Sequence, residues 1–396
     1  MTEPPPPPET RARPRLRRVH AAYAALALCL VAIVGVVWTA TAGNRPSRAL
    51  WHQSLTSPVA TASPTPSPSP SPSVQTANTI TLGAVGDIIM GKAPGSLPAD
   101  GGRTFFDKVK DLFAVDFMMG NMEQPITEDT GHVKCRPDQT SCHQFRVPPT
   151  YAAHLKAAGF HLLNQANNHG NDYGPTGYTN TQKALTDAGL LHTGSRNYVA
   201  VAEVKGVKVG VVGFSSYPRD NSLIDLAQAR TVIERAAAKA DIVVVQVHMG
   251  AEGSDKGHVK PGTEMFLGEN RGDPIAFSHA VIDAGADLVI GHGPHTLRGM
   301  ELYKGRLIAY SLGNFAGGTG LKGGEILGWG GVLQTTLSAD GALVSGRFHS
   351  TIFQTRPGIP EKDSQKRGLD LIRKLTKDDF PDTGPTISAD GLIGLH

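Results

Sequence analysis

From Ile80 onward, short runs of β-branched residues alternate with Ala- and Leu-rich amphipathic stretches. Strands that alternate with helices build layered α/β folds, because each helical connection must bury its apolar face against a sheet. We expect strands near residues 80–85, 117–119, 162–165, 207–214, 242–247 and 288–290, and later strands near 299–303, 306–310, 332–338 and 343–350. Helices are expected near residues 105–113, 151–158, 177–188, 223–239 and 274–284.

The sequence before this region divides into three segments of different composition. Residues 1–18 hold five Arg against two Glu and predict a cytoplasmic basic tail. Residues 19–42 are an apolar run, long enough to cross a bilayer as a helix, with the positive cluster on its N-terminal side. Residues 43–78 are dominated by Ser, Thr and Pro and predict a disordered or extended stalk. Together they predict a single-pass cell-membrane protein with an extracellular C-terminal domain.

The apolar run has two other interpretations. A buried core helix is disfavoured, because no charged residue follows His20 within a run of this length. Ala40-Thr41-Ala42 has the small-residue pattern that signal peptidase cuts, so secretion after cleavage near Ala42 is the alternative localisation.

The charge distribution argues against a nucleic-acid surface. The net charge is +3, and the excess of basic over acidic residues lies in residues 1–18, so the rest of the chain is close to neutral. Residues 79–350 are expected to form one folded domain, followed by a peripheral C-terminal extension at residues 351–396.

Cys135 and Cys142 lie close together in a polar stretch, residues 134–144. In an exported chain this spacing favours a short disulfide bond over two free thiols. A zinc knuckle that adds His132 and His143 is a third interpretation. It is weaker, because these residues fall in an apparent loop insertion.

Polar residues of metal-ligand type follow one predicted strand after another. In open α/β sheets, ligands bind at the carboxyl ends of the strands. A single residue of this kind is more often a cap or a hydrogen-bonded core residue, but repetition at strand after strand points to a site. The residues are Asp87, Asn121, Glu123, Asn167, Asn168, His169, His248, His292 and His295.

Each residue also has a structural interpretation. Asp87 either offers a hard anionic oxygen after a buried strand or caps a helix, and His248 is either a ligand or a core His. The turn Gly291-His292-Gly293-Pro294-His295 is the most specific local signal. It places two imidazoles three residues apart, where both can face one or two divalent ions.

Six blocks of sequence occur in a fixed order between Leu82 and Phe315. They are Gly86-Asp87-Ile-Ile-Met, Gly120-Asn121-Met-Glu123, Ala166-Asn167-Asn168-His169 with Asp172-Tyr-Gly174, Val247-His248-Met-Gly-Ala-Glu252, Asp283-Ala-Gly-Ala-Asp287 through Gly291-His292-Gly-Pro-His295, and Tyr310-Ser311-Leu-Gly-Asn314-Phe315. These blocks resemble the motifs of the CapA family of poly-γ-glutamate capsule proteins. The resemblance implies an α/β calcineurin-like metallophosphoesterase fold, a four-layer sandwich of two β-sheets flanked by helices. It also implies a role in making, exporting or attaching poly-γ-glutamate.

The resemblance further implies one or two divalent ions of Mn, Fe or Zn. By motif, Asp87 and His295 would bind the first metal, Glu123 or Asn121 would bridge, and Asn168, His248 and His292 would hold the second. His169 and Asp172 are the implied catalytic residues. The implied substrate-pocket residues are Asn167, Glu252, Ser311 and Asn314, the last of which equally suits a turn.

Two departures from the family pattern bear on activity. Ile89 stands where calcineurin-like phosphoesterases have the second ligand of Asp-x-His, and Met249 stands where many CapA relatives have Trp. The motifs favour a metal-dependent hydrolase or transferase at the cell surface, and the missing ligand favours a non-catalytic scaffold or polymer-binding subunit. The implied partners are poly-γ-glutamate or another anionic polymer, the membrane and membrane-bound capsule synthase subunits.

Overall fold

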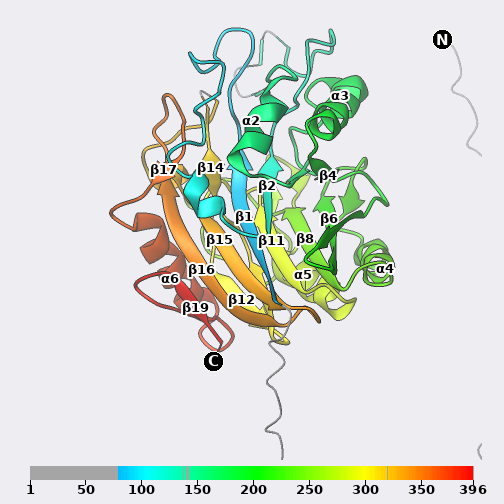
Figure 1. Cartoon of the computed structure of the whole chain (residues 1–396), viewed down its shortest axis with the longest axis vertical. Helices are drawn as coiled ribbons and strands as arrows, with labels where there is room; N and C mark the ends of the chain where they lie inside the picture. The colour runs from blue at the N-terminus through cyan, green and yellow to red at the C-terminus, as the bar shows by residue number, and fades with distance from the viewer. Residues whose placement is uncertain (1–78, 137, 140–141, 319, 396) are drawn as a thin grey trace, which may run out of the picture. The chain divides into compact units, whose positions relative to one another are not determined.

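The computed structural model describes residues 79–136, 138–139, 142–318 and 320–395 (Figure 1). The basic tail, membrane helix and stalk predicted for residues 1–78 lie outside these described residues. Within the described ranges, no helix combines the length and the apolar character needed to cross a membrane.

Ten strands form the first sheet. Their order is β18 (Thr386–Ile387), β19 (Leu392–Gly394), β16 (Leu343–Ile352), β15 (Trp329–Ser338), β1 (Thr79–Ile88), β2 (Phe117–Met122), β3 (Leu162–Asn164) and β4 (Leu191–Thr193), with β14 (Asn314–Ala316) beside β1 and β17 (Glu361–Lys362) beside β16. Strands β1 to β4 are parallel, so their carboxyl ends meet at one edge.

The second sheet has seven strands. Their order is β12 (Met300–Tyr303), β13 (Arg306–Ala309), β11 (Leu288–His292), β8 (Ile242–His248), β6 (Val207–Ser215) and β5 (Ala200–Val204), with β7 (Asn221–Ser222) beside β6. Its central strands β6, β8, β11 and β13 are also parallel. A separate hairpin consists of β9 (Met265–Phe266) and β10 (Glu269–Asn270).

The main core lies between the two sheets. Ile80, Leu82 and Ala84 alternate along β1 and pack in the same buried cluster as Val209 and Val211 of β6. This alternation follows from the two-residue period of a strand, which sends every second side chain to the same face.

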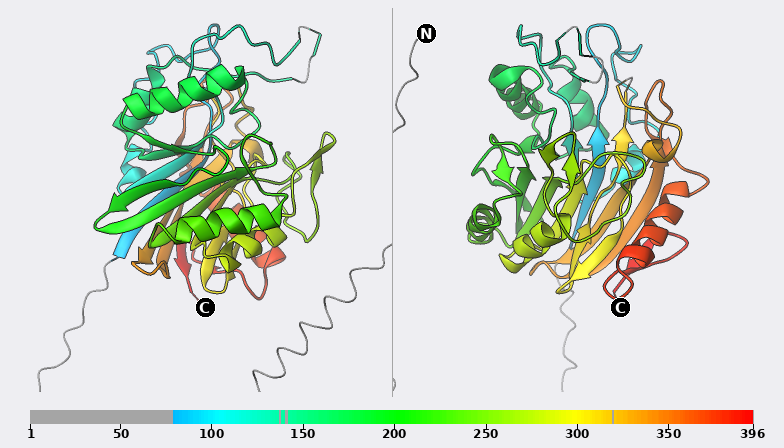
Figure 2. Two further views of the ribbon diagram at one scale, coloured as in Figure 1. Left: turned by 90° about the vertical axis from the view of Figure 1, so that its right-hand side faces the viewer. Right: turned by 180° about the vertical axis from the view of Figure 1, so that it is seen from behind.

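Helices cover the outer faces of both sheets. α2 (Tyr151–Ala158) and α3 (Gly174–Asp187) pack on the first sheet, while α4 (Leu226–Ala237) and α5 (Pro274–Asp283) pack on the second. The left view of Figure 2 shows α3 and α4 on opposite sides of the strands. The predicted fold class, a four-layer α/β sandwich with two β-sheets flanked by helices, is confirmed.

Local sequence explains where the helices of the second sheet begin. The side chain of Asp225 accepts a hydrogen bond from the backbone N–H of Gln228 at the start of α4. Asp273 does the same for Ala276 at the start of α5, where Pro274 occupies the first turn. Both are N-caps of the kind that satisfies the free N–H groups of a first helical turn.

The helix expected at residues 105–113 is replaced by successive turns, and only a 3-10 helix, η1 (Lys110–Phe113), forms there. The backbone hydrogen bonds of this segment run mostly from residue i to residue i−3. These turns place Phe105, Phe106 and Phe113 together in the cluster on the outer face of the first sheet. Burying the two adjacent Phe rings therefore overrides the helical period of the sequence.

The C-terminal segment is part of the main core, which corrects the boundary expected at residue 350. β19 pairs with β16, and α6 (Arg367–Asp379) buries Leu369 and Ile372 in the cluster between the sheets. The ring of Phe380 stacks on Tyr310 with centroids 5.0 Å apart. The segment was misjudged because its charged and Gly/Pro-rich composition conceals these few apolar residues.

Ile372→Ala tests whether α6 is structural. Ile372 is fully buried, so removing its methyl groups leaves a cavity and should lower the free energy of unfolding by about 2–4 kcal/mol in a urea titration. Lys374→Ala is the matched control on the same helix, because its side chain is 67% exposed and the change should stay within about 0.5 kcal/mol. Equal effects of the two changes would show that α6 is peripheral after all.

Candidate metal centre

The predicted ligands lie at the carboxyl ends of the central strands of both sheets. Asp87 of β1 is opposite Asn121 of β2, and His248 of β8 is opposite His292 of β11. The topology therefore brings to one edge the residues that the sequence places more than 200 positions apart.

The end of β1 is shaped to deliver Asp87. The pairing of β1 with β2 is irregular between Val85 and Asp87, which re-aims the following side chain. Gly86 lies so close to the carbonyl oxygen of Gly313 that a Cβ atom there would be 1.8 Å from it. The backbone N–H of Asp87 donates to the same carbonyl at 3.0 Å.

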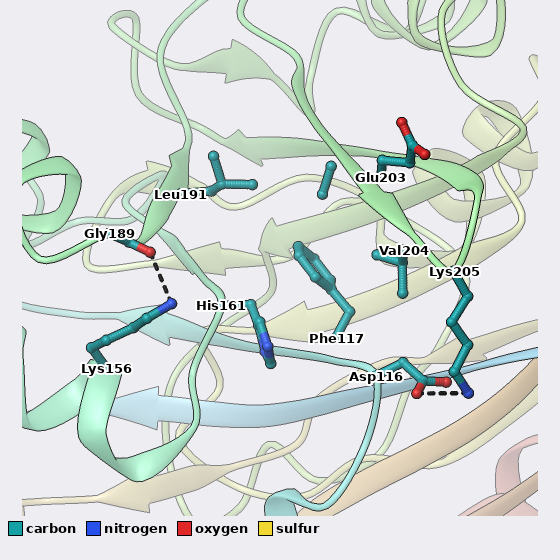
Figure 3. Close-up of a pocket in the computed structure, with 10 residues that line it drawn as sticks. Asp116, Phe117, Lys156, His161, Gly189, Leu191, Glu203, Val204 and Lys205 are labelled. Atoms are coloured by element: carbon teal, nitrogen blue, oxygen red, sulfur yellow. Dashed lines mark hydrogen bonds and ion pairs between the residues drawn. The ribbon is translucent and has the colours of Figure 1, made fainter.

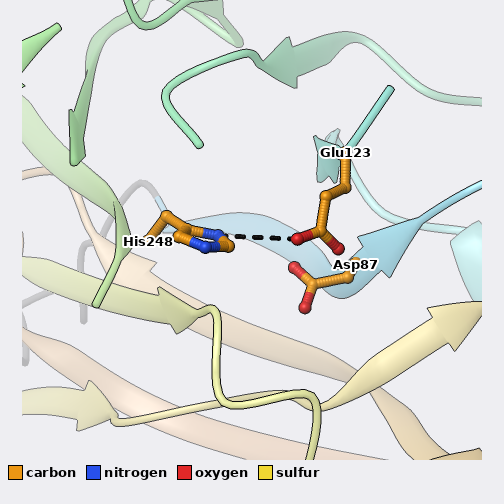
Figure 4. A group of neighbouring side chains, drawn as sticks. All are labelled: Asp87, Glu123 and His248. Carbon is orange, nitrogen blue, oxygen red and sulfur yellow. Dashed lines mark ion pairs between the residues drawn. The ribbon is translucent and has the colours of Figure 1, made fainter. Parts of the chain in front are cut away.

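Three fully buried side chains form the centre of the site (Figure 4). Asp87, Glu123 and His248 each offer one ligand atom, and these atoms lie within 4.8 Å of one another. His295 lies beside them, with Nδ1 3.3 Å from Asp87 Oδ2 and Nε2 3.7 Å from Glu123 Oε1. His292 Nδ1 is 3.9 Å from Asp87 Oδ1.

Many of the polar atoms in this group lack a hydrogen-bond partner although they are buried. They are Asp87 Oδ2, both carboxylate oxygens of Glu123, Asn168 Oδ1, and Nδ1 of both His248 and His292. Leaving buried polar groups unpaired costs free energy, so such groups normally have a partner. Carboxylate and imidazole donors suit Mn, Fe and Zn ions, and the residues present therefore fit a divalent metal.

The pKa shifts of the buried groups also indicate that a positive charge would stabilise the site. Burial, together with the nearby carboxylate of Asp87, raises the pKa of Glu123 well above its ordinary value. Burial also opposes ionisation of Asp87, but the nearby imidazoles of His295 and His292 bring its pKa below the usual range. For His295, burial is outweighed by Glu123, Asp87 and Glu252, which raise its pKa.

The predicted catalytic pair is in contact. His169 Nδ1 lies 2.8 Å from Asp172 Oδ2, and this buried carboxylate also accepts from the backbone N–H of Phe145 at 2.8 Å. His169 and Asn168 line a cavity of about 580 Å³ together with Glu252. The cavity therefore gives access to His169.

The other predicted pocket residues are buried within the loops of the site. Asn167 donates to Asn121 Oδ1 at 3.1 Å and to the carbonyl oxygen of Met122 at 3.0 Å. The hydroxyl of Ser311 accepts from the backbone N–H of Gly313 at 3.1 Å. None of these side chains lines the cavity of about 580 Å³.

Asn314 supports the turn that carries His295. Its Oδ1 lies 2.8 Å from His295 Nδ1, and its Nδ2 donates to the backbone carbonyl oxygens of His295 and Leu327. His295 has a φ of 59°, a left-handed conformation that is uncommon for residues other than Gly. The structural alternative weighed for Asn314 thus has clear support, and its oxygen also orients a predicted ligand.

Two residues of the site were missed from the sequence. Arg271 is buried, donates to Glu252 Oε1 at 2.8 Å and lies 2.7 Å from His248 Nε2. Gln246 Oε1 lies 3.1 Å from His292 Nε2. Gln246 could have been recognised as the one polar residue inside an apolar strand, whereas Arg271 follows a short hairpin and carries no such signal.

Cys135 and Cys142 are joined by a disulfide bond with Cα atoms 5.5 Å apart, so that prediction is confirmed. Cys142 and its neighbour His143 line the cavity of about 580 Å³, as does Lys134. Lys134, Cys142 and His143 are therefore part of the site.

A second cavity, of about 430 Å³, lies at the beginning of β2 rather than at its end (Figure 3). Its two lysines have protein partners: Lys156 donates to the carbonyl oxygen of Gly189 at 3.0 Å, and Lys205 pairs with Asp116 at 2.9 Å. Among the described residues that line this cavity, none has a buried polar atom without a partner. We assign no function to it.

Comparison with known proteins places the chain in a family. Residues 81–319 match the family model described as bacterial capsule synthesis protein PGA_cap. The chain belongs to this family. It is 30% identical over 332 residues to the PGA biosynthesis protein CapA of Bacillus subtilis, an alignment that covers 74% of this chain and 77% of that protein. It is 32% identical over 258 residues to the capsule biosynthesis protein CapA of Bacillus anthracis, which covers 60% and 59% respectively.

Among solved structures, this PGA_cap protein matches a 5'-nucleotidase precursor from Thermus thermophilus with a TM-score of 0.39 and 15% identity. The match covers 76% of this chain and 59% of that one. The resemblance to CapA that was drawn from the sequence motifs is confirmed by the family model and by both CapA relatives.

The loop that carries Asn167 contacts a partly buried ion pair of this PGA_cap chain. The Arg219 guanidinium donates to the carbonyl oxygen of Asn167, and its Nε lies 3.5 Å from Asp220 Oδ1. Asp220 also accepts from the hydroxyl of Ser215 at 2.5 Å. Burial raises the pKa of Asp220 to about 7 despite the nearby charge of Arg219.

The stability of Asp220→Asn relative to wild type should increase as the pH rises. Because the pKa of Asp220 is raised in the folded state, its contribution to stability is full below its unfolded pKa of about 4 and is lost as pH rises to about 7. The unfolding free energy of the variant minus that of the wild type should rise by about 2–4 kcal/mol between about pH 5 and pH 8. Urea titrations at the two pH values measure it, and a constant difference would contradict the assignment.

Gly86→Ala should disrupt the end of β1, because its Cβ would overlap the backbone of Gly313. We expect a loss of about 3 kcal/mol or more in the free energy of unfolding, measured by urea titration. Gly95→Ala is the control: nothing lies within 4 Å of the position that a Cβ atom would take there, so the loss should be below about 0.5 kcal/mol. Tolerance of Gly86→Ala would mean that the close approach of Gly86 to the backbone of Gly313 is not required.

Proposed function

We propose that this PGA_cap protein is a metal-dependent hydrolase or transferase that acts on a phosphate ester or an amide bond of an anionic capsule polymer at the cell surface. The observation that carries the proposal is the set of buried carboxylate and imidazole atoms without partners, converging at the ends of both sheets. A structural core has no need of such a set.

The proposed ligands divide around Glu123. Asp87 and His295 would hold an ion on one side of this carboxylate, and His248 and Asn168 would hold one on the other. His292, whose Nδ1 faces Asp87, adds a further nitrogen. A divalent ion bound there supplies Lewis-acid polarisation of a phosphoryl or carbonyl oxygen and lowers the pKa of water.

His169 is the proposed acid and base. Its Nδ1 is held by Asp172, which fixes the ring and leaves Nε2 as the nitrogen that can exchange a proton. Burial lowers the pKa of His169 even though Asp172 opposes this effect, so the neutral ring, which can accept a proton, predominates near neutral pH.

The proposed location is the outer side of a membrane. The disulfide bond between Cys135 and Cys142 supports an oxidising compartment, and the apolar run at residues 19–42 supports a single-pass anchor. The relatives named for PGA and capsule biosynthesis support poly-γ-glutamate as the polymer.

A non-catalytic role as a scaffold or polymer-binding subunit is the second candidate, and Arg271 favours it. Its guanidinium can only donate, so His248 Nε2 accepts and the ring proton sits on Nδ1, the atom that faces Glu123. His248 could bind an ion through Nδ1 only after Arg271 released Nε2. The buried Ile89 also stands where a second ligand of the first metal is expected.

Metal content and hydrolysis of bis(p-nitrophenyl) phosphate by the full-length protein test the two candidates. Wild type should retain one or two Mn, Fe or Zn ions, and His295→Ala should lose metal. His169→Ala should keep its metal but lose about 10²–10⁴-fold in kcat. A wild type that stays metal-free and inert after supplementation with each ion would reject the catalytic proposal and favour the scaffold.

A further inference from the structure

The cavity of about 580 Å³ beside His169 is lined by a positively charged side chain, Lys134. This residue belongs neither to the family motifs nor to the proposed metal ligands. Lys134 lines this cavity together with His169, Asn168 and Arg271. It directly precedes Cys135 of the disulfide bond, whereas His169 and Arg271 of the same cavity follow much later in the chain.

The ammonium group of Lys134 is held by several polar contacts in the cavity. It forms an ion pair with the buried carboxylate of Asp172 and lies 3.4 Å from both the carbonyl oxygen of Asn168 and Nδ1 of His169. His169 Nδ1 is already engaged by Asp172 at 2.8 Å, and an ammonium group has three donors. The side chain of Lys134 is 31% exposed, so it is not closed off from the cavity.

The remaining charges of the cavity leave Lys134 as the group best placed to attract an anion. Glu252 and Glu269 also line the cavity and would repel an anionic substrate. Arg271 is almost fully buried, and its Nη1 and Nη2 are directed to Glu252 and His248, while its buried Nε has no hydrogen-bond partner. An anionic group that approaches His169 would therefore meet the ammonium group of Lys134 beside it.

The disulfide bond constrains the backbone next to Lys134. Cys135 and Cys142 close a short loop, which restricts the conformations available to the residue next to it. The chain after the loop is anchored as well, because Gln144 donates to the carbonyl oxygen of Asp172 at 2.9 Å and Phe145 donates to its carboxylate.

We propose that Lys134, held in place by the Cys135–Cys142 disulfide, is a specificity-determining residue that binds an anionic group of the substrate, a carboxylate or a phosphate, beside His169. This inference rests on the proposed function for the identity of His169 as the reacting group. Anion binding itself can be measured without turnover.

The test is calorimetric binding of two probes to the full-length protein, with metal content determined for every variant. A γ-linked glutamate pentamer presents carboxylates, and dimethyl phosphate presents a phosphodiester, so the two arms distinguish the sources of the anion. Lys134→Ala should weaken the binding of at least one probe about 10- to 100-fold, the range for a hydrogen bond to a charged group, without changing metal content. Lys134→Arg, which keeps the charge, should stay within about fivefold of wild type.

Two further variants separate recognition from stability. Lys205→Ala removes a lysine that also pairs with an aspartate, but at the beginning of β2, and should bind both probes as wild type does. The double variant Cys135→Ser with Cys142→Ser should weaken the same probe as Lys134→Ala, because the lysine is no longer held.

The proposal is overturned if wild type binds neither probe. It is equally overturned if Lys134→Ala binds both probes with wild-type affinity and only its Tm or kcat falls, because Lys134 would then merely neutralise Asp172. If wild type hydrolyses no substrate but binds a probe in a way that depends on Lys134, the proposed hydrolase activity is rejected and the recognition role of Lys134 is retained.

Discussion

Complete burial of two neighbouring carboxylates, Asp87 and Glu123, is the constraint on which the rest of the site depends. Placing two like charges together without water is strongly unfavourable unless a cation compensates them. His295 supplies part of that charge, and several atoms around the pair have no hydrogen-bond partner. A divalent ion resolves this imbalance, and so the metal proposal follows from electrostatics as well as from motif.

The arrangement of the two sheets makes the burial of Asp87 and Glu123 possible. Two sheets end at one edge, and their parallel central strands deliver Asp87 and His248 from opposite layers of the sandwich. The irregular end of β1, with Gly86 against Gly313, turns Asp87 toward the site. The turn with His295 in a left-handed conformation is a second local distortion, and such distortions are commonly found at functional sites.

The layered fold and most residues of the candidate metal centre could be predicted from the sequence, because strand ends and the turn after β11 are visible as local patterns. It was insufficient where long-range packing decides. The turns around Phe105 and Phe106 replace a predicted helix, since both rings must reach one cluster. Arg271 and Lys134 reach the site from loops, so no periodicity marks them, and only the folded chain brings them to His248 and His169.

The central claim is that a divalent ion occupies the space between these carboxylates and imidazoles. Anomalous X-ray diffraction from crystals of the protein grown with Mn²⁺ tests it most directly. The account predicts an anomalous peak at coordination distance, about 2.0–2.3 Å, from Glu123 and from either Asp87 with His295 or His248 with Asn168. It would be contradicted by a map without a peak there, in which Arg271 and His295 alone neutralise the two buried carboxylates.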